Sequence, residues 1–547
     1  MPALPTPPQE ALDAWRELLG PDRVLTPPDV PARYRADTAA GAPHIPLVLK
    51  PAHAGQVPAL MKIASDHRVP VHPISTGNNW GYGSAHANTP GTAIVDLGDL
   101  DKITAFDEEL GVVTLEPGVT QGKLARYLDE HQLDFMVPVT GAGPSCSVLA
   151  NALERGYGIT PYVDHFGAVT NLEGVLADGS VYCSALHEAG SPELARLFKW
   201  DIGPYVDGLF TQSGFGIVTS MSIALARRPE VAKVCLFSLP SDDLLETAVE
   251  RVRTLLSQLP GTVGGVNLMN QHRVLAMTAP YPRGQLGPDG LMPQALVEQM
   301  GRAYQIAPWT GFATLYGTRR MVKAAQAQMR QTLRGVATRL VFLSPTQADW
   351  LARLARMLPG ALGERLGRTA STLNASLELV QGRPNETALP ITYWRSNVPQ
   401  PTGDRNPARD GCGLLWYAPL IPMRPKTVRK FVNFAHRELR ARGMEPLITL
   451  TSQGDRLFDS TVPLLFDRQD AQAAQQASET LEDLIRIGQD EGFYPYRLHV
   501  QSQPAHQARL HRSSQLVQRL RQALDPHDLL APGRYANRGE ANGDTGG

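Results

Sequence analysis

The sequence has few cysteines, almost no net charge and no long apolar run, and each shortage excludes a class of protein. Its four cysteines lie far apart and form no Cys-x-x-Cys pair, so we expect no metal site and no disulfide framework. A net charge of −1 over 547 residues leaves no basic surface for nucleic acid and no polybasic patch for a membrane. No apolar run could span a bilayer, and residues 1–20 lack the basic and apolar regions of a secretory signal. We therefore expect a cytoplasmic protein with reduced thiols that binds neither nucleic acid nor membranes.

The remaining composition is that of a large globular protein. With 42% hydrophobic and 19% charged residues, the chain is long enough for two or more domains, each with its own core. Periodic apolar patterns predict strands at 46–51, 69–75, 93–97 and 112–116, and helices at 9–19, 54–66 and 121–130. Short strands mixed with helices favour an α+β fold over a regular βαβ repeat.

The sequence pattern changes near Arg227. Residues 241–259 are strongly periodic and predict a long helix with one apolar face. The polar, proline-rich stretch 398–410 predicts a loop. The tail from 536 onward is rich in glycine, asparagine and aspartate, which predicts disorder.

Three glycine-rich segments are the most informative feature. Residues 74–83, ISTGNNWGYG, contain three glycines and two asparagines, which permit positive φ angles and close backbone approach. Successive N–H groups in such a loop can bind a pyrophosphate, although the spacing alone favours an ordinary turn and matches neither a Rossmann nor a Walker A motif. A second cluster spans 140–147 and leads into 151–158, and a third at 214–219 could place flat backbone beside a planar ring.

In this order and spacing, these segments resemble the flavoprotein family of vanillyl-alcohol oxidase and p-cresol methylhydroxylase (PCMH). The matching stretches are ISTGNNWGYGSA (74–85), LEPGVT (115–120), the run 137–167, FKWDIGPYVDGLFTQSGFGIVT (198–219), GLLWYAP (413–419), YRLH (496–499) and LDPHDLLAPGR (524–534). The resemblance implies a two-part FAD-binding domain of the PCMH type, with an inserted α+β cap domain that closes over the flavin ring. The implied parts are 1–226 and 496–535 for the FAD-binding domain, 227–495 for the cap, and 536–547 for a disordered tail.

The resemblance also implies which residues bind FAD. They are Ser75, Thr76, Gly77, Asn78, Asn79, Trp80 and Gly81 in the first segment, Gly141, Gly143, Ser147, Asn151, Glu154, Arg155, Gly156 and Gly158 in the second, and Gly216, Ile217, Val218 and Arg534 beyond them. We expect this FAD to be non-covalent. Leu414 stands where the oxidase has a histidine bonded to the flavin, and the methylhydroxylase's tyrosine falls near Asn406. Tyr393 is a candidate for that link only if 398–410 is an insertion.

Tyr82, Tyr496 and Arg497 match the family's phenol-binding group. A free phenol has a pKa near ~10, and two hydroxyls with one guanidinium around its oxygen favour the phenolate. A phenolate pushes electron density to the para position and eases hydride loss from the benzylic carbon, and Arg497 can also neutralise charge on the flavin. The alternatives are that Tyr82 packs on the flavin ring, that Tyr496 is a core aromatic, and that Arg497 serves the flavin alone.

The polar residues around this group depart from the family's pattern. Residues 456–460, RLFDS, lack the two histidines of the family's cap, and the oxidase's active-site aspartate is replaced near 139–140. Asp459 could supply a carboxylate there, although we favour the interpretation of a solvated loop residue. His165 is expected to position the FAD-binding loop, and His499 would share the face of the catalytic arginine if the YRLH stretch were a strand.

Together these features predict a FAD-dependent oxidoreductase that oxidises a para-substituted phenol, such as a p-alkylphenol or a 4-hydroxybenzyl alcohol. Hydride would pass from the benzylic carbon to flavin N5 and leave a p-quinone methide. An oxidase of another biosynthetic alcohol, and a flavin-binding electron-transfer protein with little catalysis, are the alternatives. The expected partners are a small-molecule substrate, oxygen or a cytochrome-like protein as electron acceptor, and further copies of the chain in a homo-oligomer.

Overall fold

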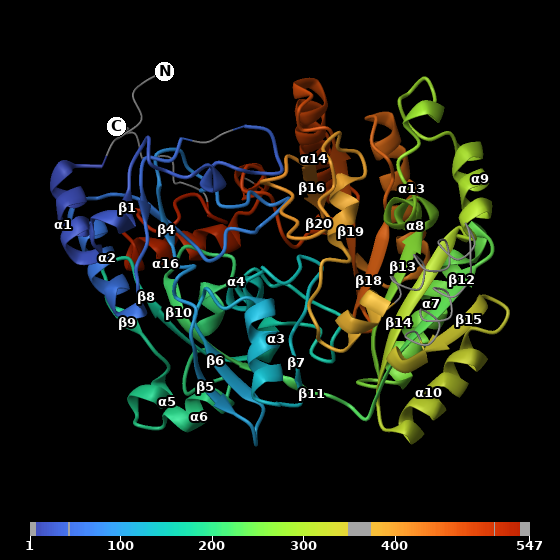
Figure 1. The fold of residues 1–547 in the computed structure, drawn as a ribbon, viewed down its shortest axis with the longest axis horizontal. Coiled ribbons are helices and arrows are strands. Elements are labelled where there is room, and N and C mark those ends of the chain that lie inside the picture. The colour runs from blue at the N-terminus through green and yellow to red at the C-terminus, as the bar shows by residue number, and fades with distance from the viewer. Residues whose placement is uncertain (1–6, 42–43, 348–373, 508, 537–547) are drawn as a thin grey trace.

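The molecule consists of two lobes that lie side by side (Figure 1). The structure, a computed structural model, describes residues 7–41, 44–347, 374–507 and 509–536. One lobe contains the N-terminal elements together with the red C-terminal segment, and the other contains the green, yellow and orange elements between them (Figure 1). The chain leaves the first lobe, builds the second and returns, which is the two-part arrangement with an inserted cap that the family resemblance implies.

The first lobe is built on small sheets. The four-stranded sheet contains, in spatial order, β1 (Val24–Leu25), β2 (Val48–Leu49), β4 (Ala93–Asp96) and β3 (Val71–Ile74). The five-stranded antiparallel sheet contains β5 (Ile103–Asp107), β6 (Val112–Leu115), β10 (Ile217–Ala224), β8 (Val169–Val175) and β9 (Val181–Tyr182). A separate pair joins β7 (Phe135–Met136) to β11 (Ala226–Arg227). The glycine-rich segments follow β3, precede the helix at 148–153 and lead into β10, so all three belong to this lobe.

Helices pack on these sheets. They are α1 (Gln9–Leu19), α2 (Val57–Asp66), α3 (Gln121–Glu130), α4 (Val148–Leu153), α5 (Ala185–Glu188) and α6 (Pro192–Leu197), with α15 (Gln503–Gln507) and α16 (Arg512–Leu524) from the C-terminal segment. Leu12 and Trp15 of α1 are buried against the four-stranded sheet, because both lie on the apolar face of the helix. Thr120 begins α3 by accepting a hydrogen bond from the Lys123 N–H at 3.1 Å. Both helices have the bounds that their periodicity predicts.

The C-terminal segment pairs with the four-stranded sheet. The N–H of Val71 donates to the carbonyl of Leu529 at 2.8 Å, and the N–H of Ala531 donates to the carbonyl of Val71 at 2.7 Å. Leu530, between them, is fully buried in the core formed with α1 and α2. Arg521 of α16 supports this turn through its ion pair with Asp528 at 2.6 Å. The two ends of the chain therefore share one hydrophobic core.

Within the described ranges, the cap contains a nine-stranded antiparallel sheet. In spatial order its strands are β15 (Thr338–Leu343), β12 (Val231–Leu239), β14 (Trp309–Gly317), β13 (Val263–Asn270), β18 (Thr449–Gln453), β19 (Leu457–Phe466), β17 (Pro419–Pro422) and β20 (Tyr494–Pro495), with β16 (Gly413–Tyr417) also paired to β19. Its helices include α7 (Leu245–Gln258), α8 (Gln271–Thr278), α9 (Gln294–Tyr304), α10 (Arg319–Thr332), α13 (Pro425–Ala441) and α14 (Ala471–Asp490).

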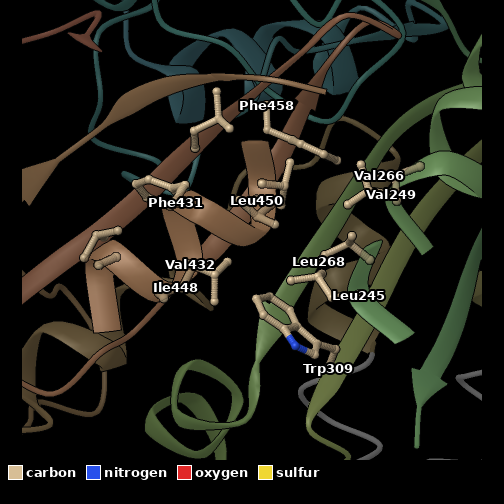
Figure 2. Close-up of a cluster of buried hydrophobic side chains, with 14 of the residues drawn as sticks. Leu245, Val249, Val266, Leu268, Trp309, Phe431, Val432, Ile448, Leu450 and Phe458 are labelled. Carbon is tan, nitrogen blue, oxygen red and sulfur yellow. The ribbon is translucent and has the colours of Figure 1, made fainter. Parts of the chain in front are cut away.

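Figure 2 shows where the helices of the cap meet its sheet. Leu245 and Val249 of α7 lie in one buried cluster with Leu268 of β13 and Trp309 of β14 (Figure 2). The helix predicted at 241–259 is α7, preceded by a single 3-10 turn. One face of the cap sheet is thus covered by helices, which leaves the opposite face for the first lobe.

Two further predictions concern the stretch 398–410 and the tail from 536 onward. The stretch predicted as a loop, 398–410, forms neither helix nor strand. The predicted disordered tail lies outside the described residues from 537 onward. Among the helices of the described ranges, none combines the length and apolarity needed to cross a membrane.

Truncation of Leu268 tests how far the cap depends on its buried cluster. Leu268 is fully buried, so Leu268→Ala leaves a cavity, and we expect the free energy of unfolding to fall by about 2–5 kcal/mol. Met321→Ala on α10 is the control, because Met321 is 50% exposed, and it should change this free energy by less than about 0.5 kcal/mol. Urea unfolding followed by tryptophan fluorescence measures both. Equal losses in the two variants would contradict the prediction.

Candidate active site

A cavity of about 520 Å³ lies between the two lobes. The first lobe supplies one wall from the loops after β3, before α4 and before β10. The C-terminal segment adds Tyr496, Arg497 and Arg534. The cap supplies the opposite wall from β13, α8, β16, β18 and β19, with Asn267, Met269, Arg273, Leu414, Trp416, Thr449, Thr451 and Thr461. The cavity thus joins segments from the beginning, middle and end of the chain.

Most residues expected to bind FAD line this cavity. They are Ser75, Thr76, Gly77, Asn78, Asn79, Trp80, Gly141, Ser147, Asn151, Glu154, Gly156, Gly158, Gly216, Val218 and Arg534. The expected catalytic residues Tyr82, Tyr496 and Arg497 line it too. The fold therefore brings together three loops that the sequence alone could only place one after another.

Four of the expected FAD-binding residues are not among the lining: Gly81, Gly143, Arg155 and Ile217. Arg155 has a φ of +54°, and its exposed side chain donates to Thr211 Oγ1 at 3.0 Å. Ile217 lies in the core on the other side of β10, because its neighbours Gly216 and Val218 face the cavity. The roles assigned to these four residues stay predictions.

Gly81 instead lets the cap approach the first lobe. Its φ is +78°, a region that glycine adopts without strain, and a Cβ there would collide with the indole of Trp416. Its N–H donates to Thr38 Oγ1 at 2.8 Å. Gly81 therefore shapes the boundary between the lobes at the edge of the cavity.

Bare backbone makes the first-lobe wall fit a flat cofactor with a pyrophosphate tail. Five of its lining residues are glycines: Gly77, Gly141, Gly156, Gly158 and Gly216. A Cβ on Gly158 would overlap the carbonyl of Val139 and the ring of His165, so only glycine allows this close approach. Asn78 Nδ2 donates to the carbonyl of Ser145 at 3.2 Å and ties the first loop to the second. The three segments form a surface of peptide groups that fits FAD.

His165 lies behind this surface, next to Asn151 and Gly158, and its expected role in positioning the FAD-binding loop stays a prediction. Its Nδ1 lies 2.6 Å from Asn151 Nδ2, so the ring accepts a hydrogen bond from that amide. Burial lowers the pKa of His165 to about 4, which keeps the ring neutral and able to accept. Ser147 plays a comparable part at the start of α4, where its Oγ accepts from the Ala150 N–H at 3.1 Å.

One carboxylate links the expected catalytic arginine to the cofactor wall. Glu154 forms an ion pair with Arg534 and a second with Arg497, whose Nε lies 3.3 Å from Oε2. Arg497 also donates to Asn79 Oδ1 at 2.5 Å. Because one carboxylate faces two guanidinium groups, this cluster keeps one positive charge in excess.

Tyr82, Tyr496 and Arg497 converge at this charged side of the cavity. The guanidinium carbon of Arg497 lies 4.3 Å from the centre of the Tyr82 ring. Among the described residues, none hydrogen-bonds to the hydroxyl of Tyr82 or Tyr496. Burial raises the pKa of each tyrosine hydroxyl well above the ordinary value for tyrosine, so each stays a neutral O–H donor. Two donors and one cation are thus available to a ligand oxygen.

Asp459 is not the solvated loop residue that we favoured from the sequence. It lies in β19, is fully buried, and accepts a hydrogen bond from the hydroxyl of Tyr157. Burial raises the pKa of Asp459 to about 7, although the Tyr157 hydroxyl acts against this shift. The ring centre of Tyr157 lies 6.0 Å from that of Tyr496. A carboxyl group that titrates near neutral pH therefore stands one tyrosine away from the expected phenol site.

The rest of the cap wall is a face of the sheet that sequence reasoning missed. Two rows of cross-strand partners on β13, β18 and β19 make up this face: Asn267, Thr451 and Asp459 in one row, and Met269, Thr449 and Thr461 in the next. All of them except Asp459 line the cavity. Alternation is the signal that could have found them, because Phe458 faces the core whereas Thr461 lines the cavity.

The structure also shows where Leu414 and Tyr393, the positions considered for a covalent flavin link, lie. It likewise places His499, which the sequence set beside Arg497. Leu414 lines the cavity and presents only carbon atoms to it. Tyr393 is not among the lining residues, and its hydroxyl donates to Asp410 at 2.6 Å. His499 does not follow a strand, because β20 ends at Pro495, and its Nε2 lies 3.7 Å from Asp37 Oδ2.

Comparisons with known proteins agree with this geometry. A family model described as an FAD binding domain matches residues 45–183. The 1'-carboxy-chondrochloren decarboxylase of Chondromyces crocatus is 34% identical over 538 residues, which cover 98% of each chain. The 4-cresol dehydrogenase (hydroxylating) flavoprotein subunit of Pseudomonas putida is 26% identical over 536 residues, covering 96% of this chain and 95% of the relative.

Solved structures show the same fold. The structure of p-cresol methylhydroxylase with substrate bound superimposes with a TM-score of 0.84 and 26% identity, over 96% of each chain. The 4-ethylphenol oxidase from Gulosibacter chungangensis, in its isoeugenol complex, has a TM-score of 0.85 at 23% identity, over 96% of this chain and 97% of the other. At that identity the second likeness speaks for the fold alone.

Replacement of Asp459 by asparagine tests whether this buried carboxyl titrates near neutral pH. Between an unfolded pKa of ~3.9 and the folded value, the folded protein keeps a proton that the unfolded chain releases, so rising pH favours unfolding by up to ~1.4 kcal/mol per pH unit. Asp459→Asn removes this loss, and its free energy of unfolding should improve relative to wild type between about pH 5 and about pH 7.5. Urea unfolding at both pH values measures the difference. Asp455→Asn in the same hairpin, where the side chain is 43% exposed, is the control; an equal pH response in both variants would contradict the prediction.

Proposed function

Because this chain belongs to the p-cresol methylhydroxylase and vanillyl-alcohol oxidase family of FAD-dependent oxidoreductases, we propose that it oxidises a para-substituted phenol. One observation carries the proposal: Tyr82, Tyr496 and Arg497 converge on the cavity that the three glycine-rich segments line. Two neutral hydroxyls and a guanidinium are the groups that bind and stabilise a phenolate oxygen.

The residues of the cluster favour the ionised form of such a substrate. The excess positive charge shared by Arg497, Arg534 and Glu154 attracts a phenolate, while Tyr82 and Tyr496 donate hydrogen bonds to its oxygen. When bound, FAD supplies the hydride acceptor. The electron pair on the phenolate oxygen assists departure of hydride from the benzylic carbon and leaves a p-quinone methide. The Asp459–Tyr157 pair stands where a proton or a water molecule could be held during the later steps.

Oxidative decarboxylation is a second candidate function, favoured by the relative named 1'-carboxy-chondrochloren decarboxylase, which matches 98% of this chain. A p-quinone methide with a carboxylate on the carbon next to the benzylic carbon can lose CO2. The electrons of the broken C–C bond then form an alkene and restore the aromatic phenolate. Hydride transfer to the flavin is the only oxidation of the substrate, and the reduced flavin then passes its two electrons to the same acceptor as in phenol oxidation.

The relatives suggest two kinds of electron acceptor. Oxygen as acceptor is supported by the likeness to the 4-ethylphenol oxidase, and a protein acceptor by the likeness to the 4-cresol dehydrogenase, whose flavoprotein is one subunit of the enzyme. The expected homo-oligomer and the expected cytoplasmic location stay predictions. The four cysteines are unpaired, in agreement with a reducing compartment.

The link between protein and flavin gives the first functional test. Leu414 has no nucleophile, and the Tyr393 hydroxyl is bound to Asp410 outside the cavity lining, so the FAD should be non-covalent. Purified protein should be yellow and release its FAD on acid precipitation, and the denatured chain should show no fluorescent band on a gel. A persistent band would contradict this prediction, and its disappearance in Tyr393→Phe would identify the bond.

The catalytic assignment predicts a graded loss of flavin reduction. Arg497→Ala removes the charge that stabilises the phenolate and should slow anaerobic reduction by ~10²–10³. Tyr82→Phe and Tyr496→Phe each leave the guanidinium and one hydroxyl in place, so each should slow it less. The measurement is the reduction rate with p-alkylphenols and, as matched compounds, their methyl ethers, which cannot become phenolates.

The substrate panel distinguishes the alternatives. Reduction by the phenol and not by its ether supports the proposal. Equal rates with both would mean that the phenolate is irrelevant and would favour oxidation of another alcohol. No reduction by any phenol or alcohol would favour an electron-transfer protein. A carboxylated substrate that yields CO2 and an alkene, in place of an alcohol, would select the second candidate.

A further inference from the structure

The proposed mechanism leaves one charged group of the cavity unused. Arg273 lies in the first turn of α8, on the cap, and lines the same cavity as Tyr82 and Tyr496. Its backbone N–H donates to Asn270 Oδ1 at 3.0 Å, which caps the helix and fixes where the side chain starts. The arginine is therefore held in place by its own helix and not by a partner of its side chain.

The guanidinium of Arg273 has no partner among the described residues. Its Nε and Nη1 are buried without a hydrogen bond, and no carboxylate of the described ranges forms an ion pair with it. Burial lowers the pKa of Arg273 to about 10, yet a guanidinium stays protonated at neutral pH. A buried, uncompensated cation is costly, and such a charge normally has an anionic partner.

The other two arginines of the cavity share a single carboxylate, so each has an anionic partner that Arg273 lacks. Arg497 and Arg534 both pair with Glu154, and that cluster belongs to the first lobe. The cavity-lining residues of β13, the strand that directly precedes α8, are Asn267 and Met269, and neither carries a charge. The hydroxyl of Tyr157 acts electrostatically on Arg273, and the ring of Tyr157 neighbours that of Tyr496. Arg273 thus lies on the cap side of the phenol site.

We propose that Arg273 binds a carboxylate on the para substituent of the substrate, so that the natural substrate is a 4-hydroxyphenyl compound with an acidic side chain. This inference rests on the proposed function, because it takes the phenol oxygen to lie at Tyr82, Tyr496 and Arg497. A para substituent then extends from the first lobe toward the cap, where Arg273 stands.

A carboxylate fits better than a phosphate. Parallel N–H groups of a guanidinium match the two oxygens of a carboxylate. A phosphate would bring up to two negative charges, whereas this side of the cavity offers one uncompensated cation among the described residues. Hydroxyl and amide groups of Thr451 and Asn267, which share the wall, can donate further hydrogen bonds to a carboxylate oxygen but add no charge.

The test compares an acid with its ester in the holoenzyme. 4-Hydroxycinnamate and its methyl ester have no sp³ benzylic hydrogen, so binding can be measured by calorimetry without turnover. Wild type should bind the acid more tightly than the ester. Arg273→Gln should weaken binding of the acid by about 10- to 100-fold and leave binding of the ester nearly unchanged. Arg273→Lys keeps the charge without the planar fork and should lose only part of the preference.

A matched control and a kinetic readout separate binding from damage to the fold. Arg302→Gln, at an exposed position of α9, should bind both ligands as wild type does. With 3-(4-hydroxyphenyl)propanoate as reductant, Arg273→Gln should raise the substrate concentration for half-maximal flavin reduction far more than it lowers the limiting rate. If Arg273→Gln does not fold, Arg273→Lys carries the same comparison.

The outcomes distinguish this inference from the proposed function. An acid preference that collapses in Arg273→Gln supports the carboxylate site. Equal affinity of wild type for acid and ester, or a preference that survives in Arg273→Gln, overturns it, while reduction by neutral p-alkylphenols would still uphold the proposed function. An acid preference that depends on Arg273, in a protein that no phenol reduces, would uphold the carboxylate site and overturn the proposed oxidation.

Discussion

The site depends on the ion pairs through which Glu154 binds Arg497 and Arg534. Glu154 comes from the second glycine-rich segment, and both arginines come from the segment that returns after the cap. The backbone pairing of Val71 with Leu529 and Ala531 brings that segment into position, so the same return that completes the core also completes the cavity. The cofactor wall and the positive charge of the cavity therefore depend on the same return of the chain to the first lobe.

The sequence was most informative where local chemistry dictates local structure. The bounds of α1 and α3 follow from periodicity and caps, and α7 differs only by its first turn. The loops at 74–83 and 140–158 and the returning YR pair could be assigned to one site only through a family resemblance, because spacing alone cannot bring the ends of the chain together. The structure supplies that contact as hydrogen bonds and a shared core.

The cap wall could not be predicted in the same way. Asp459 sits in a polar stretch that is typical of a loop, yet β19 continues through it because β17 and β18 pair with it on both sides. Arg273 resembles any arginine at the start of a helix, and only the two buried, unpartnered nitrogens of its guanidinium set it apart. Both cases depend on long-range packing, which no window of sequence contains. Side chains along β19 nevertheless alternate between its two faces, so that Phe458 faces the core and Thr461 faces the cavity.

Substitutions on the two faces of the cap sheet have different effects on the protein. Side chains such as Leu268 and Phe458 meet the helices, whereas Asn267, Thr451 and Thr461, on the same strands, meet the cavity. A substitution on the cavity face alters what the enzyme accepts without creating a void in the core. The cap can therefore change at alternate positions of its strands without any change in the lobe that holds the cofactor.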